Sequence, residues 1–240
     1  MNREDNIITS FSNPIFKELL DLKENGKKSG RVLIEGEDGV KIALNRGLLV
    51  KTVTCEYDYA YAEKEEIIIS KELMRKLSSY NSLPKVIGIV EYKLASKAEG
   101  ERIVYLDGIQ DPGNLGTLMR NALAFSYRSL VLSKDCVSPY NFKAVQASKG
   151  AFLGLDITYE SLTDLKNDGY KIISADLKGE DIKKFVRPEG KICLVIGSEG
   201  QGIKKENLLL SDYRVLLPIE KEIDSLNAGV AGGIMMYLLR

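Results

Sequence analysis

Polar side chains stand beside glycine-rich segments at three places in the second half of the chain. In DPGNLGTLMRNA, Arg120 follows Asn114 by six residues. In LVIGSEGQG, an apolar run leads into a glycine-rich turn that holds Glu199, and in SLNAGVAGG, Ser225 and Asn227 precede a run of small residues. Glycines let backbone groups approach a ligand closely, and open α/β sheets bind ligands at the carboxyl ends of their strands. These segments are therefore candidates for ligand contact, although each alone also fits an ordinary helix cap or tight turn.

The composition limits the chemistry that these residues could perform. The chain has no histidine, which excludes histidine triads, histidine metal sites and histidine acid–base catalysis. Its cysteines, Cys55, Cys136 and Cys193, are far apart, so they predict no metal site and indicate a reducing cytoplasm. Neither a GK[ST] loop nor G-x-G-x-x-G is present at the glycine-rich turn. Catalysis must use carboxylates, Lys, Arg, Tyr, Ser, Asn or backbone groups.

Strands and helices are expected to alternate around the three segments. Nearly continuous apolar runs predict parallel strands that are covered on both faces: RIVYLDGI, SLVLS, LDITYE, KIISADL, KICLVIGSEG and YRVLLPI. Helices are expected in NLGTLMRNALAF, with Asn114 at its start, in NFKAVQASKGAF, and after Ser225, which would be the N-cap of the last helix. Glycine costs about 1 kcal/mol per site inside a helix relative to alanine. The glycines of that last helix therefore predict close approach to another segment or to a ligand.

The first part of the chain shows shorter elements of the same kind. Helices are predicted in NPIFKELLDLKENG, with Asn13 as N-cap, in EDGVKIALNRG and in KELMRKLSSY, and strands in RVLIEG, LLVKTVTCE, EEIIIS and VIGIVEY. A polar stretch then predicts a linker over residues 96–101, between a domain of residues 1–95 and a second of residues 102–240. The 240 residues are 44% hydrophobic and 28% charged, as in a soluble globular protein, and they contain neither a membrane-length apolar run nor a signal peptide.

The order of the three segments resembles a known family. The motifs are similar to the signature motifs of the SpoU-type, or TrmH-type, RNA 2′-O-ribose methyltransferases of the SPOUT superfamily. In chain order they are N-x-G-x-x-x-R-x-A, IGSEGxG, and LP followed by SLN. The resemblance covers about residues 102–240, and LIEGEDGVKIAL resembles the small substrate-binding domain that often comes first. It implies an α/β-knot methyltransferase domain with a deep trefoil knot, preceded by a small α/β domain that resembles a ribosomal protein and binds RNA.

The resemblance also implies the cofactor and its contacts. S-adenosylmethionine would lie in the knot and be held mostly by backbone groups. Gly197, Leu217 and Leu226 are the matching contacts, together with Ile196 and Ser198. Glu199 would orient the loops through hydrogen bonds.

The implied reaction is attack of a ribose 2′-hydroxyl on the activated sulfonium methyl, so the enzyme must align atoms and manage one proton. Arg120 matches the family's proposed proton acceptor. Because the pKa of arginine lies above 12, a neutral guanidinium is costly, and binding an RNA phosphate or a developing alkoxide is physically easier. Asn114, Ser225 and Asn227 would position Arg120 or the ribose.

The expected partner is RNA, with 23S ribosomal RNA favoured over tRNA. The 34 basic and 34 acidic side chains give a net charge of zero, so phosphate binding requires a local basic patch. Lys27, Lys28 and Arg31 are the candidates, although a solvated loop is the alternative for that cluster. A homodimer in the cytoplasm is implied, with GIMMYLL of the last helix as either its contact surface or part of the core.

Three other functions are weighed against this one. A non-catalytic RNA-binding protein with the same fold would not need Asn114, Arg120, Glu199, Ser225 and Asn227 together. A knotted methyltransferase that modifies a base remains open. An ordinary nucleotide-binding α/β enzyme is disfavoured, because the phosphate-loop motifs are missing.

Overall fold

The computed structural model describes residues 7–26, 29–55, 64–220 and 222–240. Their packing divides the chain into two compact units. Unit 1 consists of Met1–Lys93 and Ser138–Leu153, and unit 2 consists of Leu94–Val137 and Gly154–Arg240. The chain first passes from unit 1 to unit 2 between Lys93 and Leu94, shortly before the linker predicted at residues 96–101. Residues 138–153 were expected in the second domain, and their packing in unit 1 is a difference from that expectation.

Unit 1 contains a four-stranded sheet with the order β1-β4-β2-β3. Its strands are β1 (Arg31–Glu35), β2 (Leu49–Thr54), β3 (Glu65–Ile68) and β4 (Val86–Glu91). β4 pairs antiparallel with β1 and β2, and β2 pairs parallel with β3. Its helices are α1 (Pro14–Asn25), α2 (Glu37–Asn45), α3 (Lys71–Leu77) and α5 (Phe142–Ala147). Asn13 caps α1 as predicted, because its side chain accepts a hydrogen bond from the Ile15 amide.

Side-chain hydrogen bonds explain why residues 138–153 belong to unit 1. β1 is an edge strand, which leaves backbone groups without a neighbouring strand. The Gln146 amide of α5 donates to the Leu33 carbonyl at 3.0 Å and accepts from the Glu35 amide at 3.1 Å. Phe142 joins the hydrophobic core of this unit. The expected single helix over NFKAVQASKGAF is divided, because Lys149 and Gly150 have left-handed φ angles of 51° and 82° before the short 3-10 helix η3 (Ala151–Gly154).

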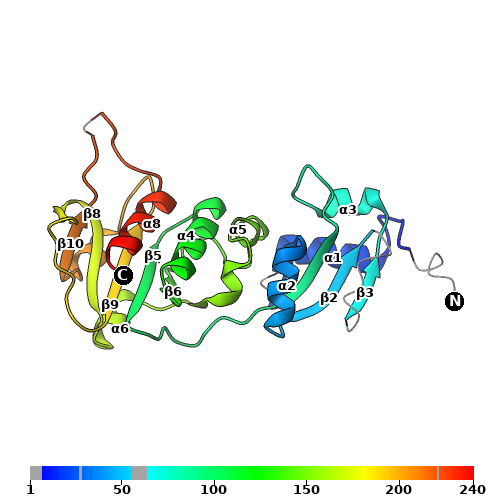
Figure 1. The fold of residues 1–240 in the computed structure, drawn as a ribbon, viewed down its shortest axis with the longest axis horizontal. Helices are drawn as coiled ribbons and strands as arrows, with labels where there is room; N and C mark the ends of the chain where they lie inside the picture. The colour runs from blue at the N-terminus through cyan, green and yellow to red at the C-terminus, as the bar shows by residue number, and fades with distance from the viewer. Residues whose placement is uncertain (1–6, 27–28, 56–63, 221) are drawn as a thin grey trace. The chain divides into compact units, whose positions relative to one another are not determined.

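Unit 2 is built on a six-stranded sheet with the order β10-β8-β9-β5-β6-β7 (Figure 1). Its strands are β5 (Arg102–Asp107), β6 (Ser129–Leu132), β7 (Asp156–Thr158), β8 (Lys171–Asp181), β9 (Ile192–Gly197) and β10 (Tyr213–Leu216). Every neighbouring pair is parallel. The predicted α/β fold with parallel strands is therefore confirmed. The carboxyl ends of β5, β9 and β10 lead into the three segments that carry the motifs.

Four α-helices accompany this sheet in the described part of unit 2. They are α4 (Pro112–Ala124), α6 (Leu162–Asn167), α7 (Lys205–Leu209) and α8 (Ala228–Leu238). Alternate strand residues point to opposite faces. On one face, Ile103 and Cys193 join a core that includes Leu162 and Leu165 of α6. On the other face, Ile196 faces Gly232 of α8.

The glycines of α8 allow it to pack closely against α4, which lies beside it in Figure 1. A Cβ atom at Gly229 would lie 2.9 Å from Cγ2 of Thr117, and one at Gly233 would lie 2.6 Å from Nδ2 of Asn121. Asn121 also donates a 2.9 Å hydrogen bond to the Gly229 carbonyl. The close approach predicted from these glycines is therefore confirmed, and α4 is the neighbouring segment.

Two helix starts differ from their predicted positions. α4 begins at Pro112, and its N-cap is Asp111, whose side chain accepts from the Asn114 amide at 2.8 Å. α8 is capped by Asn227 rather than Ser225, since the Asn227 side chain accepts from the Val230 amide. Asp, Asn and Ser are all good N-caps, so residue type alone does not select between neighbours. In the described residues, no helix has the length and apolar character required to cross a membrane.

Candidate active site

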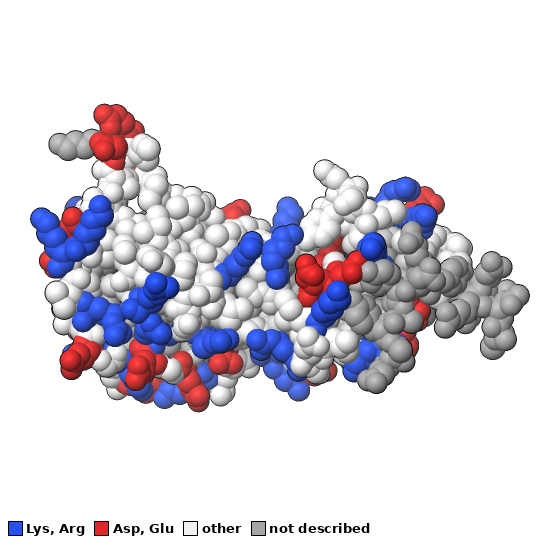
Figure 2. All heavy atoms as spheres, in the orientation of Figure 1, with Lys and Arg blue, Asp and Glu red and all other residues white. Residues whose placement is uncertain are grey.

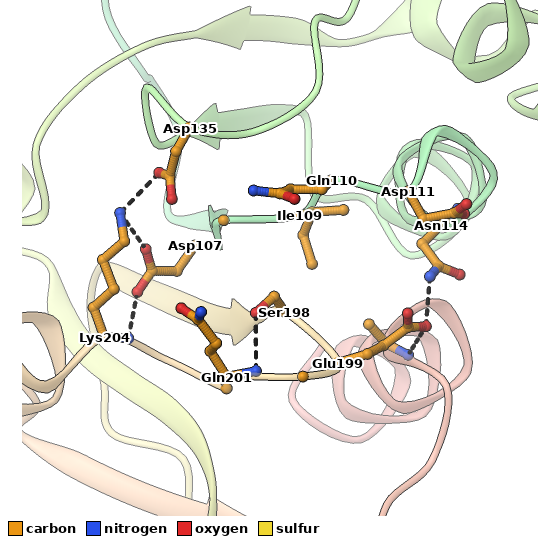
Figure 3. Close-up of a pocket in the computed structure, with 14 residues that line it drawn as sticks. Asp107, Ile109, Gln110, Asp111, Asn114, Asp135, Ser198, Glu199, Gln201 and Lys204 are labelled. Carbon is orange, nitrogen blue, oxygen red and sulfur yellow. Dashed lines mark hydrogen bonds and ion pairs between the residues drawn. The ribbon is translucent and has the colours of Figure 1, made fainter.

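Asn114, Glu199 and Asn227 come together from three separate segments of unit 2. Asn114 lies in the first turn of α4, Glu199 follows β9, and Asn227 caps α8. The Asn114 side-chain amide donates to Oε1 of Glu199 at 2.5 Å (Figure 3), and the Asn227 amide donates to the same oxygen at 2.8 Å. Asn227 also donates to Oδ1 of Asn114 at 2.8 Å. We call these three residues the Asn–Glu–Asn network, and it joins the motifs through a single carboxylate.

A cavity of about 520 Å³ opens beside the network, and we call it the larger cavity. Its walls come from β8, from the loops that follow β9 and β10, and from α8. All five residues expected to contact the cofactor line it: Ile196, Gly197, Ser198, Leu217 and Leu226. Much of the remaining lining is apolar, with Leu208, Leu216 and Met235 among the side chains. Its size and apolar lining with few polar groups suit a small organic ligand.

Gly197 is required by the shape of the loop that follows β9. A Cβ atom at this position would collide with the backbone of Gly202 and Ile203. The loop folds back on itself, because Ser198 and Gly202 exchange backbone hydrogen bonds of 3.2 and 2.9 Å. The glycine therefore permits a close approach between two backbone segments, and this turn forms one wall of the larger cavity.

A second cavity of about 300 Å³, which we call the smaller cavity, lies at the carboxyl ends of β5, β6 and β9 (Figure 3). Residues 198–202 line both cavities. Asn114 and Glu199 contribute to the smaller cavity, together with polar side chains that were not predicted as site residues: Asp107, Gln110, Asp111, Asp135, Gln201 and Lys204.

A buried carboxylate anchors one side of the smaller cavity. Asp107 ends β5 and is 1% exposed, and its Oδ2 accepts from the Lys204 backbone amide and the Asn207 side chain, both at 2.8 Å. The Lys204 ammonium contacts Oδ1 of Asp135 at 2.8 Å. This contact raises the pKa of Lys204, and the hydrogen bonds from Lys204 and Ser133 lower the pKa of Asp135. Asp107 could have been proposed from the sequence, because it is an acid at the end of a predicted strand, which is where open α/β sheets place ligand-binding groups.

The remaining predicted site residues do not join the network. Arg120 is exposed on α4 and lines neither cavity, and no hydrogen bond or ion pair links it to another described residue. Ser225 is exposed and lines the larger cavity, without a hydrogen bond to the three network residues. Arg31 begins β1 in unit 1, while Lys27 and Lys28 lie outside the described residues. Within the described ranges, no cluster of three Cys, Asp or Glu side chains is arranged to hold a metal ion.

The fold is similar to those of solved structures over nearly the whole chain. An AdoMet-bound rRNA methyltransferase from Sinorhizobium meliloti superposes with a TM-score of 0.86 at 24% identity, covering 98% of this chain and 97% of that one. AviRb from Streptomyces viridochromogenes, a SpoU methyltransferase solved with AdoMet, superposes with a TM-score of 0.84 at 21% identity, covering 95% and 97%. At these identities the likeness establishes the fold.

The sequence comparisons identify the family. The 23S rRNA (guanosine(2553)-2'-O)-methyltransferase RlmP of Bacillus subtilis is 24% identical, over 92% of this chain and 93% of its own length. Residues 101–237, more than half of the chain, match the SpoU rRNA Methylase family. The enzyme class predicted from the three motifs, an RNA methyltransferase, is thereby confirmed, and the chain belongs to the SpoU rRNA Methylase family.

Proposed function

We propose that this protein transfers a methyl group from S-adenosylmethionine to a ribose 2′-hydroxyl in 23S ribosomal RNA. The observation that carries the proposal is the position of the Asn–Glu–Asn network between two cavities. One cavity has the size and lining for a nucleoside-like cofactor, and the other is polar and open to a second reactant. RlmP, which aligns over nearly the whole chain, is named for 2′-O-methylation of a 23S rRNA guanosine.

The larger cavity would hold S-adenosylmethionine, which supplies an activated methyl group when bound. Gly197, Leu217 and Leu226 would contact it, with Ile196 and Ser198 beside them. The fit rests on the folded loop at residues 198–202, which presents backbone groups to the cavity, and on the apolar side chains opposite. Glu199 holds this loop against α4 and α8 by accepting from both asparagines.

Arg120 would act on the RNA side of the reaction. It is an exposed cation on α4, the helix whose first turn supplies Asn114. Since the pKa of arginine lies above 12, we assign Arg120 to binding an RNA phosphate and stabilising the developing alkoxide rather than to holding a proton. The O–CH3 bond would form as the S–CH3 bond breaks, and the 2′-hydroxyl proton would pass to water. Asn114 and Asn227 would position the ribose, and Ser225 would contribute from the rim of the larger cavity.

The proposal includes a deep trefoil knot in the chain of unit 2. Its support is that the segment between β10 and α8 lines the same cavity as residues 198–202, while α8 packs back against α4. The path of the chain in an experimental electron-density map tests it.

The exposed side of α8 would form a homodimer interface. Val230, Ile234, Tyr237 and Leu238 are 50%, 41%, 47% and 45% exposed, and their spacing places them along one side of the helix. Met235 and Met236 are buried instead, so GIMMYLL contributes to the core and to the surface. Figure 2 shows a largely uncharged area over α8. Exposed apolar patches of this kind mark protein–protein contact sites.

Unit 1 would capture RNA as the small ribosomal-protein-like domain. On the visible face, Lys and Arg are scattered among Asp and Glu (Figure 2), in keeping with a net charge of zero. A local patch of Lys27, Lys28 and Arg31 would bind phosphates, and the protein would act in the cytoplasm. If so, replacing all three with alanine will weaken RNA binding and reduce its salt dependence.

The proposal is tested by mapping ribose methylation in cells. Ribosomal RNA and tRNA from strains with and without the gene are hydrolysed with alkali, which spares the phosphodiester bond next to a 2′-O-methyl group. We expect one resistant position in 23S rRNA that disappears with the gene. A resistant position in tRNA would support the alternative tRNA substrate. Identical patterns in both strains would contradict ribose methylation and favour a base-modifying methyltransferase or a non-catalytic RNA-binding protein.

A further inference from the structure

The smaller cavity contains amide side chains to which no described protein group is hydrogen-bonded. Gln110 lies in the turn between β5 and α4, and Gln201 lies in the loop after β9. Figure 3 shows both side chains extending into the hollow from different walls. Neither side-chain amide has a hydrogen-bond partner in the described part of the chain. Each amide offers two N–H donors and an oxygen acceptor, so the cavity presents groups that could read the edge of a ligand.

The charges in the smaller cavity disfavour a phosphate. Asp107, Asp111, Asp135 and Glu199 contribute four carboxylates to its lining, and Lys204 is the single cation among the described lining residues. That ammonium is already engaged, at 2.8 Å from Asp135 and 3.6 Å from Asp107. This excess of negative charge would repel a phosphate, but it would not repel an uncharged heterocycle.

One carboxylate oxygen remains available to accept a hydrogen bond from such a ligand. Oδ1 of Asp135 accepts from Lys204 and from Oγ of Ser133, but no described side chain donates to its Oδ2. These two hydrogen bonds lower the pKa of Asp135, so the carboxylate is ionised near neutral pH. Figure 3 shows the Asp135 carboxylate beside the hollow that Gln110 and Gln201 enter.

The smaller cavity is also in the right place for part of the methyl acceptor. It shares residues 198–202 and Ala228 with the larger cavity, so one loop separates the two. Asn114 and Glu199 border it on the side of the network. An RNA ribose that reaches the network would bring its own base within reach of this cavity. The volume of about 300 Å³ is at the lower end of ligand pockets and suits a single base.

We infer that the smaller cavity binds the base of the target nucleotide and that guanine is the base it prefers; this inference rests on the proposed function. Guanine carries the N1–H and N2–H₂ donors side by side, and it carries the O6 and N7 acceptors. Asp135 accepts from the donors, and the amides of Gln110 and Gln201 donate to the acceptors. A site built to hydrogen-bond a ligand rejects analogues that leave its polar groups unpaired, so these three residues determine specificity.

The first test measures methyl transfer to 23S rRNA purified from a strain that lacks the gene. The variants are Gln110→Ala, Gln201→Ala and Asp135→Asn, and the matched control is Asp156→Asn, an exposed acid on β7 that lines neither cavity. Each cavity variant should lower kcat/KM for RNA by about tenfold or more. Gln110→Ala and Asp135→Asn change residues that do not line the larger cavity, so they should leave the Kd for S-adenosylmethionine within about twofold. The control should retain the wild-type value of both.

The second test replaces the mapped target guanosine with inosine, which lacks the N2 amino group, in a synthetic RNA fragment. Wild-type protein should methylate the inosine fragment more slowly, and Asp135→Asn should lose this discrimination. Gln110 and Gln201 are exposed and have no described partner, so their replacement does not threaten folding.

Several results would overturn the inference. A pyrimidine at the methylated position, or wild-type turnover in both glutamine variants, would show that the base lies elsewhere. Weaker S-adenosylmethionine binding in Gln110→Ala or Asp135→Asn would assign the smaller cavity to the cofactor. Failure of the proposed function gives a different result, because wild-type protein would then methylate no ribose at all.

Discussion

The side-chain amide of Asn114 donates a 2.5 Å hydrogen bond to the carboxylate of Glu199, which lies 85 residues further along the chain. This contact joins the start of α4 to the loop that follows β9. Asn227 and the Ala228 amide donate to the same oxygen at 2.8 and 3.4 Å. One carboxylate oxygen therefore positions the start of α8 and the loop that separates the two cavities.

Replacing Glu199 with glutamine should weaken this arrangement. The glutamine oxygen is a neutral acceptor, and hydrogen bonds to charged groups are roughly twice as strong as neutral ones. We expect the Kd for S-adenosylmethionine to rise by about tenfold, measured by calorimetry. Glu189→Gln removes an exposed carboxylate that lines neither cavity and serves as the control. Equal cofactor affinity in the two variants would show that the network does not hold the cofactor loops.

Replacing Arg120 with alanine should remove methyl transfer and spare cofactor binding. Arg120 is exposed and lines neither cavity, so its charge is available to RNA. Loss of one group that stabilises developing charge lowers kcat by about 100- to 1000-fold. A radiolabel transfer assay measures the rate, calorimetry measures the cofactor Kd, and Arg128→Ala, an exposed arginine of the same unit, is the control. Residual turnover within a few-fold of wild type would remove Arg120 from the proposed machinery.

The two glycines of the β9 loop should respond differently to alanine. A Cβ atom at Gly197 would collide with the backbone of Gly202 and Ile203, whereas one at Gly200 meets no atom within 4 Å. Gly197→Ala should lower the free energy of unfolding by about 1–3 kcal/mol and abolish cofactor binding, because the loop must open. Gly200→Ala should change unfolding by less than about 0.5 kcal/mol. Thermal unfolding of the ligand-free proteins decides this, and similar Tm values would contradict the loop geometry.

A charge on the exposed side of α8 should dissociate the proposed homodimer. Ile234→Glu places a carboxylate in the row of Val230, Tyr237 and Leu238, where burial without a partner is costly. We expect wild-type protein to have twice the monomer mass by light scattering at micromolar concentration, and the variant to have the monomer mass with an intact fold. Val186→Glu alters an 85% exposed side chain away from α8 and should remain dimeric. A wild-type monomer would exclude the dimer at that concentration.

Local patterns predict the sheet of unit 2 because its parallel strands are buried on both faces. Apolar runs such as KICLVIG therefore mark strands, and β9 runs from Ile192 to Gly197 as expected. The glycines of α8 predict close packing because helix glycines are costly without it. The sequence pattern did not predict α6 and α7. They have six and five residues, and helices this short depend on tertiary packing rather than on periodicity.

Contacts between distant segments explain what local patterns miss. Residues 138–153 belong to unit 1 because Gln146 pairs with the edge of β1, which lies 111 residues earlier. The Asp107–Lys204 contact spans 97 residues and defines the smaller cavity. Helix starts were misplaced by two residues at α4 and at α8, where Asp111 and Asn227 compete with other good caps. The family resemblance supplied Asn114, Glu199 and Asn227, and the structure shows their hydrogen bonds.

The most direct test of ribose methylation follows the transferred methyl group itself. Purified protein is incubated with S-adenosylmethionine that carries a tritiated methyl group and with 23S rRNA from a strain that lacks the gene, and the RNA is then hydrolysed completely with alkali. We predict that the label will be recovered in an alkali-resistant dinucleotide, because a 2′-O-methyl group blocks attack of the 2′-oxygen on the adjacent phosphate. Recovery of the label in mononucleotides would place the methyl group on a base and would contradict the proposed reaction.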